Sequence, residues 1–396
     1  MFAALVVGLG AGMVMSIMHL PGQRQVLAVA QPIGQLWLDA LTMTVVPLVF
    51  GLLVTGIASA ATTASSSNVA VRSVLWFAVL LTAACILSAL STNTLLALWP
   101  VSDKASLATS GTSMPELAPA AEWFRGIIPT NPIKAAAETA MVPLVLFAVL
   151  FGLATARIEP ALGATIVTFF QAVVQAMLVI VGWVLWIAPV GILALAYAAA
   201  ARMGVSAAGT LLQYIVTVIA ACLITTIMAY AAAVMAGRMS LARFARAAAP
   251  AQTVAISTQS SLASLPVMID AAAGLGIGKA SAGVVLPLAV SIFRAASAAA
   301  NVAVAIYLAH LHGVSLSLPV LAIGTLIAVP VSLAAVGLPA QVSFFATIGP
   351  VCLAMGVPIE ALPLLLAVET VPDLFRTLGN VTADLAVARL ASDRIG

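Results

Sequence analysis

The chain has 396 residues, of which 63% are hydrophobic and only 7% are charged, and its formal net charge is +3. Soluble globular domains carry about 25% charged residues, so the composition excludes that class and predicts an all-α polytopic membrane protein. The basic residues are scattered over short loops and do not indicate a nucleic-acid partner, and the cysteines stand singly in apolar segments without the spacing of a metal or redox site: Cys85, Cys222 and Cys352.

The first 250 residues contain six long apolar stretches, and a helix needs about 20 apolar residues to cross a bilayer. We expect membrane helices over residues 2–19, 33–60, 73–98, 135–156, 166–198 and 209–235. The first stretch has no basic segment before it, so we expect a membrane helix there and not a cleavable signal. The segment 101–130 mixes proline, serine and charges of both signs, and we expect it to be a surface loop.

The distribution of basic residues predicts the orientation. Three alternate connections between these helices carry arginines: Arg72, Arg157 and the cluster Arg238–Arg246. Alternation places these loops on one side of the membrane with the N-terminus, and the positive-inside rule makes that side cytoplasmic. If the following region contains re-entrant hairpins, the C-terminus lies there too, with three more basic residues: Lys279, Arg389 and Arg394.

The C-terminal third departs from simple spanning helices, because two polar segments that contain proline interrupt it. They are Gln252–Pro266 and Ser332–Gln341, and each precedes another long apolar stretch, 281–311 or 359–390. Interrupted helices in matching positions of two half-repeats are typical of transporters with inverted repeats, whose substrate site lies at the repeat interface. We therefore expect two re-entrant hairpins, since unwound backbone inside a membrane must line protein or a water-filled cavity.

The last apolar stretch carries a ladder of polar residues. Its members recur at spacings of four, three, four and four: Glu369, Asp373, Arg376, Asn380 and Asp384. On a helix these spacings place all five on one face. Such groups are costly in lipid, so this face is expected to line a protected polar site. The alternative interpretation is an intrahelical ion pair of Asp373 with Arg376 that only lets a polar helix stay buried.

Five stretches follow one another in the order, and near the spacing, of one family's motifs. They are LTMTVVPLVF from Leu41, IPTNP from Ile128, TQSSLASLP from Thr258, LPL from Leu286 and DLFRTLGNV from Asp373. Over nearly its whole length the chain thus resembles the dicarboxylate/amino acid:cation symporter family, the glutamate-transporter homologues. The resemblance implies eight transmembrane helices plus two re-entrant helical hairpins, an elevator-type mechanism with inverted repeats, and a homotrimer.

The resemblance also implies a division of the chain into two parts. Residues 1–249 are expected to form scaffold and peripheral helices 1–6, of which helices 3 and 6 move with the transport domain. Residues 250–396 are expected to form the transport core, with hairpin 1, helix 7, hairpin 2 and helix 8.

The same resemblance assigns substrate contacts. It implies that Asp373 binds the amino group of a substrate and that Arg376 binds its side-chain carboxylate, which agrees with the planar fork that arginine offers to a carboxylate. Four further contacts are implied: Ser260, Ser261, Thr377 and Asn380. For Ser260 and Ser261, simple turn chemistry at the hairpin tip is the alternative. Because a C4-dicarboxylate has no ammonium for Asp373, we expect an acidic amino acid.

The resemblance fails in the cation and gating segments. Where the family's helix 7 reads Asn-Met-Asp-Gly-Thr, residues 293–297 read Phe-Arg-Ala-Ala-Ser, so that Phe293 and Ala295 replace two sodium-binding residues. The second hairpin tip keeps only Gly337 and Pro339, and Gln259 replaces an arginine at the first. Asn380 and Asp384 match a residual sodium site and Ser291 can supply a hydroxyl, but hard cations need several oxygens.

Arg294 enters this helix where the cation ligands disappear. Our hypothesis is that its guanidinium lies near Asp384 or Glu369 and replaces a bound cation, so that transport is sodium-independent: proton-coupled through Glu369, facilitative, or an exchange. A structural pair of Arg294 with a carboxylate is the alternative. Glu369 is then a proton site, a partner of Arg294 or a neutral buried acid, and Asp384 is a cation remnant or the Arg294 partner.

The sequence therefore predicts a secondary transporter of an acidic amino acid (aspartate- or glutamate-like) in a bacterial-type inner membrane. Its predicted partners are a small carboxylated substrate and the lipid bilayer, and no cofactor is expected beyond sodium or protons as coupling ion. The alternatives are a transporter of another carboxylate, such as a C4-dicarboxylate, and a non-transporting sensor. The motifs of zinc proteases and of α/β-hydrolases are absent, so no enzyme is expected.

Overall fold

The computed structural model describes residues 2–18, 22–64, 68–101, 128–203, 206–334 and 340–392. These ranges are almost wholly helical and contain no extended strand, which confirms the all-α prediction. Most of segment 101–130 lies outside the described residues, as do Gly337, Pro339 and Arg394.

The first part of the chain forms nine described helices. They are α1 (Phe2–Ile17), α2 (Gln23–Thr42), α3 (Val45–Ala64), α4 (Asn68–Leu98), α6 (Pro132–Ala137), α7 (Met141–Thr155), α8 (Pro160–Trp186), α9 (Ala188–Met203) and α10 (Ser206–Met235). By length and composition, five helical spans in the described residues are apolar and long enough to cross a membrane: Gln23–Thr62, Asn68–Leu98, Pro160–Trp186, Ser206–Met235 and Lys279–Leu311.

The second part forms eight described helices. They are α11 (Leu241–Thr258), α12 (Ser261–Gly274), α13 (Lys279–Ile292), α14 (Ala295–Leu311), α15 (Leu318–Ala334), α16 (Ala340–Ala354), α17 (Leu362–Leu366) and α18 (Thr370–Ala391). The helices α11 and α12 fold back on one another, as do α15 and α16, and each couple forms a helical hairpin at one of the two predicted interruptions.

Several stretches that we predicted as single helices are divided in the structure. The stretch 33–60 breaks at Met43 and Thr44, one turn before Pro47, and the stretch 166–198 breaks at Ile187, just before Pro189. Proline has no backbone N–H and disfavours helical geometry in the preceding residue, which explains both positions. The stretch 359–390 likewise divides between α17 and α18, close to Pro372.

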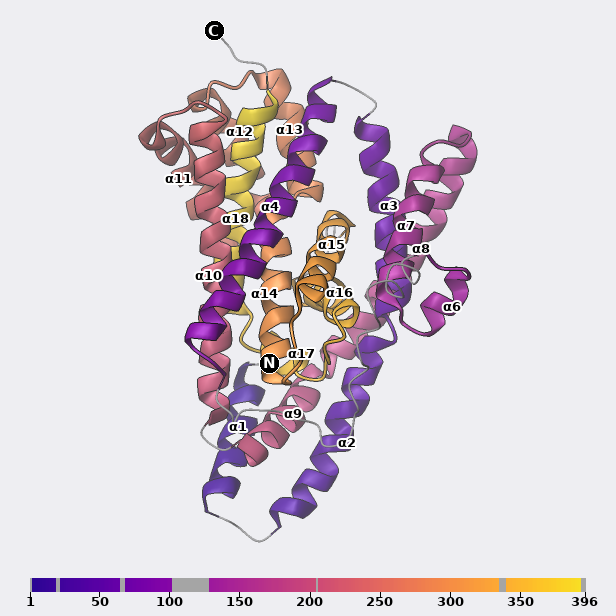
Figure 1. Ribbon diagram of the computed structural model, residues 1–396, viewed down its shortest axis with the longest axis vertical. Coiled ribbons are helices and arrows are strands. Elements are labelled where there is room, and N and C mark those ends of the chain that lie inside the picture. Colours follow the sequence, from indigo (N-terminus) through magenta and orange to yellow (C-terminus); the bar gives the residue numbers. More distant parts are fainter. Residues whose placement is uncertain are drawn as a thin grey trace.

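The N-terminal helices pack closely through glycine. A Cβ atom added to Gly8 would lie 2.6 Å from the carbonyl oxygen of Leu193, and one added to Gly12 would lie 2.6 Å from that of Tyr197. Small residues four apart let membrane helices approach each other closely. This contact joins α1 to α9, and together with α2 they form one end of the molecule (Figure 1).

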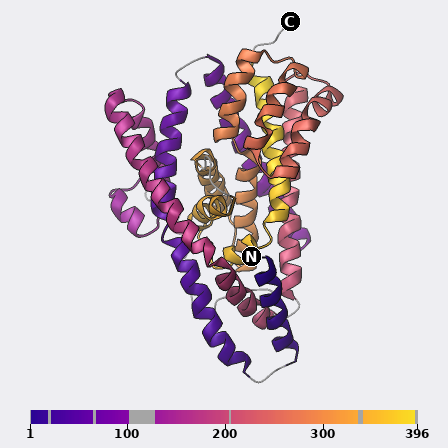
Figure 2. The same ribbon diagram turned by 180° about the vertical axis from the view of Figure 1, so that it is seen from behind.

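The remaining helices place α18 in the interior. In Figures 1 and 2, α3, α7 and α8 lie on one side, α10, α11 and α18 lie on the other, and α14 to α16 lie between them. The helix α18 packs against α4, α10, α11, α13 and α14. The polar ladder therefore meets side chains from several parts of the chain.

Candidate functional site

The polar face of α18 is buried throughout. Glu369, just before the helix, is 6% exposed, and the four ladder residues within the helix are no more than 8% exposed: Asp373, Arg376, Asn380 and Asp384. Thr377, which lies beside Arg376, is 5% exposed. Ionisable groups at such depth are expensive and indicate a functional site in a membrane protein.

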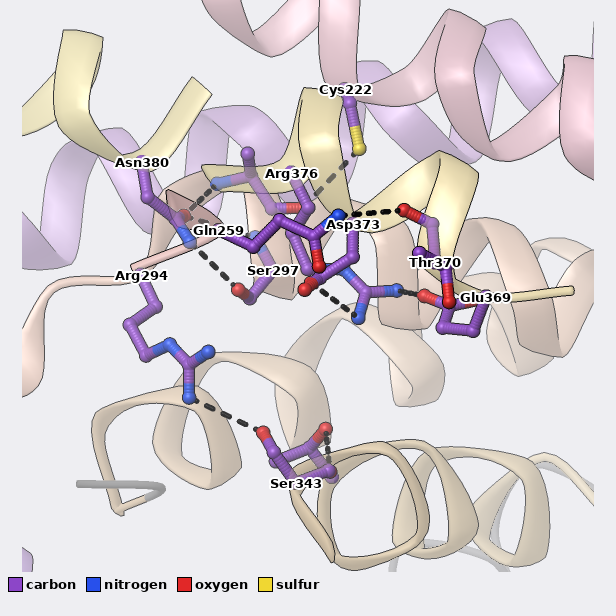
Figure 3. Close-up of polar contacts among 12 residues, drawn as sticks. Cys222, Gln259, Arg294, Ser297, Ser343, Glu369, Thr370, Asp373, Arg376 and Asn380 are labelled. Carbon is purple, nitrogen blue, oxygen red and sulfur yellow. Dashed lines mark hydrogen bonds and ion pairs between the residues drawn. The ribbon is translucent and has the colours of Figure 1, made fainter. Parts of the chain in front are cut away.

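A chain of charged contacts runs along this face (Figure 3). Arg376 Nη2 pairs with Glu369 Oε1, and the hydroxyl of Tyr214 on α10 donates a hydrogen bond to Glu369 Oε2. On its other side Arg376 Nη1 lies 3.7 Å from Asp373 Oδ1. The guanidinium is thus held between two carboxylates.

One donor of Arg376 remains available. Its Nε atom is buried and has no hydrogen-bond acceptor among the described residues. Most buried polar groups in proteins have a partner, so this unmet donor is available to a ligand acceptor. An arginine fork whose Nε–H is unused can bind a carboxylate oxygen.

Asn380 has a structural contact that the sequence did not indicate. Its Oδ1 accepts hydrogen bonds from the backbone N–H groups of Ala296, at 2.9 Å, and Ser297, at 3.2 Å, while its Nδ2 donates to Ser297 Oγ at 2.9 Å (Figure 3). The first N–H groups of a helix have no partner within it. Asn380 therefore caps α14 from a neighbouring helix.

The tip of the first hairpin reaches the start of α18. Gln259 has a left-handed backbone with φ of 53°, and its Nε2 donates to the carbonyl oxygen of Thr370 at 3.3 Å (Figure 3). Ser260 Oγ accepts from Ala263 N at 3.2 Å and so caps α12, while Ser261 is half-buried at its first turn. The tip thus lies beside Thr370, the residue that follows Glu369. Ser260 has the turn role that we gave as the alternative, and it also lies close to the site.

The chain breaks between α13 and α14, at Phe293 and Arg294. The Phe293 ring is fully buried and stacks on Phe77 of α4, with centroids 4.7 Å apart and planes at 12°. Arg294 Nη1 donates to Ser343 Oγ of α16 at 3.2 Å (Figure 3). Neither Glu369 nor Asp384 accepts a hydrogen bond from Arg294.

Ser291 faces another part of the molecule. Its Oγ donates to the carbonyl oxygen of Pro287 at 2.7 Å, and the residue lines a cavity of about 530 Å³ with residues of α3 and α8, among them Gln171 and Gln175. Within the described ranges, no three His, Cys, Asp or Glu side chains are grouped so that they could hold a metal ion.

Sequence reasoning missed three residues that shape the site: Tyr214, Ser297 and Ser343. A buried tyrosine hydroxyl usually finds a partner, so Tyr214 in an apolar stretch was a detectable signal. The identity of that partner was not detectable, because it lies on a different helix.

The chain is similar in sequence to known membrane transporters. The sequence model of the "Sodium:dicarboxylate symporter family" matches residues 1–394. The chain is 26% identical to the "Proton/sodium-glutamate symport protein" of Bacillus caldotenax, over 99% of this chain and 92% of that protein. It is 27% identical to the "Proton/glutamate-aspartate symporter" of Escherichia coli (strain K12), over 90% of this chain and 84% of that protein. It is also 26% identical to the "C4-dicarboxylate transport protein 1" of Pseudomonas aeruginosa (strain UCBPP-PA14), over 99% of this chain and 88% of that protein.

Proposed function

The chain belongs to the sodium:dicarboxylate symporter family, and from this membership we propose that it carries an acidic amino acid across the inner membrane. It is a transporter and not an enzyme, as the sequence predicted. Its similarity to glutamate and glutamate-aspartate symporters supports the choice of substrate class.

The observation that carries the proposal is the position of Arg376 beside Asp373. Both are buried on one face of α18, and Arg376 keeps an unmet Nε donor. Arg376 would bind the side-chain carboxylate of the substrate, and Asp373 would bind its ammonium group. Thr377, Ser260 and Ser261 are proposed to complete the site.

The Glu369 pair adds a step to substrate binding. The carboxylate of Glu369 already pairs with the guanidinium of Arg376. The carboxylate of an incoming substrate would therefore either share this guanidinium with Glu369 or displace Glu369 from it. The buried carboxylates of Glu369 and Asp373 both lie beside the guanidinium of Arg376 before substrate arrives. A proton on Glu369 would offset the charge that an acidic substrate brings.

A C4-dicarboxylate is the second candidate, because a relative named for that transport is 26% identical over 99% of this chain. Such a solute has two carboxylates and no ammonium group. It would meet Asp373 with like charge, which disfavours binding. The variant Asp373→Asn separates the two cases: it would weaken binding of an acidic amino acid and strengthen binding of a dicarboxylate.

The proposed architecture follows from the resemblance and from the helix order. The eight spans would be α1, α2–α3, α4, α6–α7, α8–α9, α10, α13–α14 and α17–α18, with α11–α12 and α15–α16 as re-entrant hairpins. Residues 1–249 would form the scaffold and peripheral helices, and residues 250–396 the core that moves as an elevator. A homotrimer with cytoplasmic termini is part of this proposal.

The proposal is tested on the full-length protein in detergent and in liposomes. A thermal-shift screen against acidic, neutral and basic amino acids and C4-dicarboxylates identifies the ligand class, because a ligand raises the melting temperature in proportion to the logarithm of its concentration over Kd. Saturable uptake into liposomes supports transport. Binding without flux would instead identify a sensor, and stabilisation by neutral solutes alone would refute the acidic substrate.

A further inference from the structure

We propose that a cluster of basic residues at the base of the first hairpin binds the phosphate group of an anionic membrane lipid. Figure 1 shows α11, α12, α13 and the C-terminal end of α18 together at one end of the molecule. The last of the basic residues lies about 20 Å along α18 from Arg376, so the proposal does not depend on the substrate site. The basic cluster consists of Arg238, Arg243, Arg246, Lys279 and Arg389.

Positive charge is concentrated in this part of the chain. Between residues 236 and 280 the sequence has four basic residues and one acidic residue, and all five are exposed: Arg238, Arg243, Arg246, Lys279 and Asp270. Among the described residues, no carboxylate lies within ion-pair distance of these four basic side chains. The cluster therefore carries positive charge that the described part of the chain does not neutralise.

Two guanidinium groups of the cluster meet at the turn between α12 and α13. Arg243 Nε donates to the carbonyl oxygen of Gly274 at 2.9 Å, and Arg389 Nη1 donates to that of Gly276 at 3.3 Å. A Cβ atom added to Gly276 would lie 3.5 Å from both Arg243 Nη2 and Arg389 Nη1. These two nitrogen atoms are therefore no more than twice that distance apart, and an anion between the two groups would offset their repulsion.

A phosphate group suits this arrangement. Arginine binds phosphate oxygens through charge-assisted hydrogen bonds, and its planar fork can present two N–H groups to them. The hydrogen bond of Arg243 to the turn uses its Nε atom, so its two Nη atoms can face a ligand. At Gly276, where φ is 69°, no side chain extends between the two guanidinium groups.

The surroundings favour a lipid over a free anion. Two apolar spans of membrane length border the cluster: one ends at Met235, just before Arg238, and the other begins at Lys279. Met235 and Leu241 are 76% and 59% exposed in the same part of the chain. Basic residues at the ends of membrane spans attract anionic headgroups, and the exposed apolar side chains would contact the acyl chains of the same lipid.

The first measurement is the melting temperature of the full-length protein in detergent with added short-chain lipid. Dioctanoyl phosphatidylglycerol should raise it, because a ligand of the folded state stabilises that state. Dioctanoyl phosphatidylcholine, which has the same acyl chains and no net charge, should not raise it, and neither should inorganic phosphate. An equal rise with phosphatidylcholine would show that the acyl chains alone bind, and an equal rise with phosphate would show a free-anion site. Either result would overturn the proposal.

The second measurement is the Kd for phosphatidylglycerol, obtained from the same titration. Arg243→Gln removes one charge at the turn and should raise Kd about fivefold. Arg157→Gln is the matched control, because Arg157 is also exposed but lies in the connection between α7 and α8, and its Kd should match that of the wild type. An equal loss of affinity in both variants would show a general attraction to basic surface and would refute a defined site.

A third variant covers the case in which Arg243→Gln does not yield folded protein. Lys279 is exposed and begins α13, three residues after Gly276. Lys279→Gln should raise the Kd for phosphatidylglycerol and leave the melting temperature without lipid unchanged. An unchanged Kd would contradict the proposal. None of these measurements uses a transport substrate, so a failure of the proposed transport function would be seen separately.

Discussion

The carboxylate of Glu369 pairs with the guanidinium of Arg376, about two helical turns further along the chain, and the hydroxyl of Tyr214 binds the same carboxylate from α10. All three side chains are buried. The group that we propose for binding the substrate carboxylate therefore already has an internal carboxylate as its partner.

Arg376→Lys should abolish tight binding of acidic substrates. Lysine keeps the charge but cannot present two parallel N–H groups, and we expect Kd to rise at least about 30-fold, equivalent to about 2 kcal/mol. The measurement is calorimetric titration of the purified protein. Arg246→Lys, on the exposed face of α11, is the matched control and should not change Kd. Unchanged aspartate binding in Arg376→Lys would contradict the carboxylate role.

Glu369→Gln should tighten binding of the same substrate. If the Glu369 carboxylate must yield Arg376 to the ligand, removing its charge frees the binding-competent state, and Kd should fall by about tenfold. Glu369→Asp, which keeps the charge, serves as the control. Weaker binding by Glu369→Gln would mean that Glu369 positions Arg376 and does not compete for it.

Tyr214→Phe should alter substrate affinity as well as stability. It removes the hydrogen bond to Glu369 and retains the ring that meets Tyr307 edge-on at 5.6 Å. The loss of stability should be about 1 kcal/mol, and Kd should fall because Glu369 is released more readily. Tyr307→Phe removes a buried hydrogen bond of 2.6 Å to the carbonyl oxygen of Thr210. It should reduce stability alone, and an equal effect on Kd would contradict the assignment.

Asn380→Ala should be one of the most destabilising changes in α18. It removes three hydrogen bonds and leaves two N–H groups of α14 without their cap, at a loss of about 2–4 kcal/mol. Ser297→Ala removes only one of these bonds and should lose about 1 kcal/mol. Denaturant unfolding of both variants tests the difference, which would vanish if the cap were unimportant.

Gly379→Ala should destabilise the packing of α18. Its added Cβ would lie 2.6 Å from Ala296 Cβ and 3.1 Å from Thr226 Oγ1, and overpacking of this kind typically costs about 1–3 kcal/mol. Gly182→Ala in α8 is the control, because nothing lies within 4 Å of its added Cβ. The control should be neutral or slightly stabilising, as a helix favours alanine over glycine. Equal melting temperatures would refute the close contact.

Much of this arrangement was predictable from local sequence. The alternation of apolar stretches with prolines and polar tips predicted a membrane protein with two helical hairpins, and the spacing of the ladder predicted one polar face on the last helix. The helix ends were less predictable. Pro47, Pro189 and Pro372 divide helices a few residues ahead of themselves, but no proline marks the break at Phe293 and Arg294.

The sequence by itself determined that the protein lies in a membrane, that its fold is all-α and that α18 has a polar face. These features follow from composition and periodicity, which are properties of contiguous segments. Only the tertiary structure decided which groups meet on that face. Tyr214 and Glu369, Asn380 and the start of α14, and Arg294 and Ser343 come from helices far apart in the chain. Their contacts depend on how the helices pack, and a hydrogen bond extends over only about 3 Å.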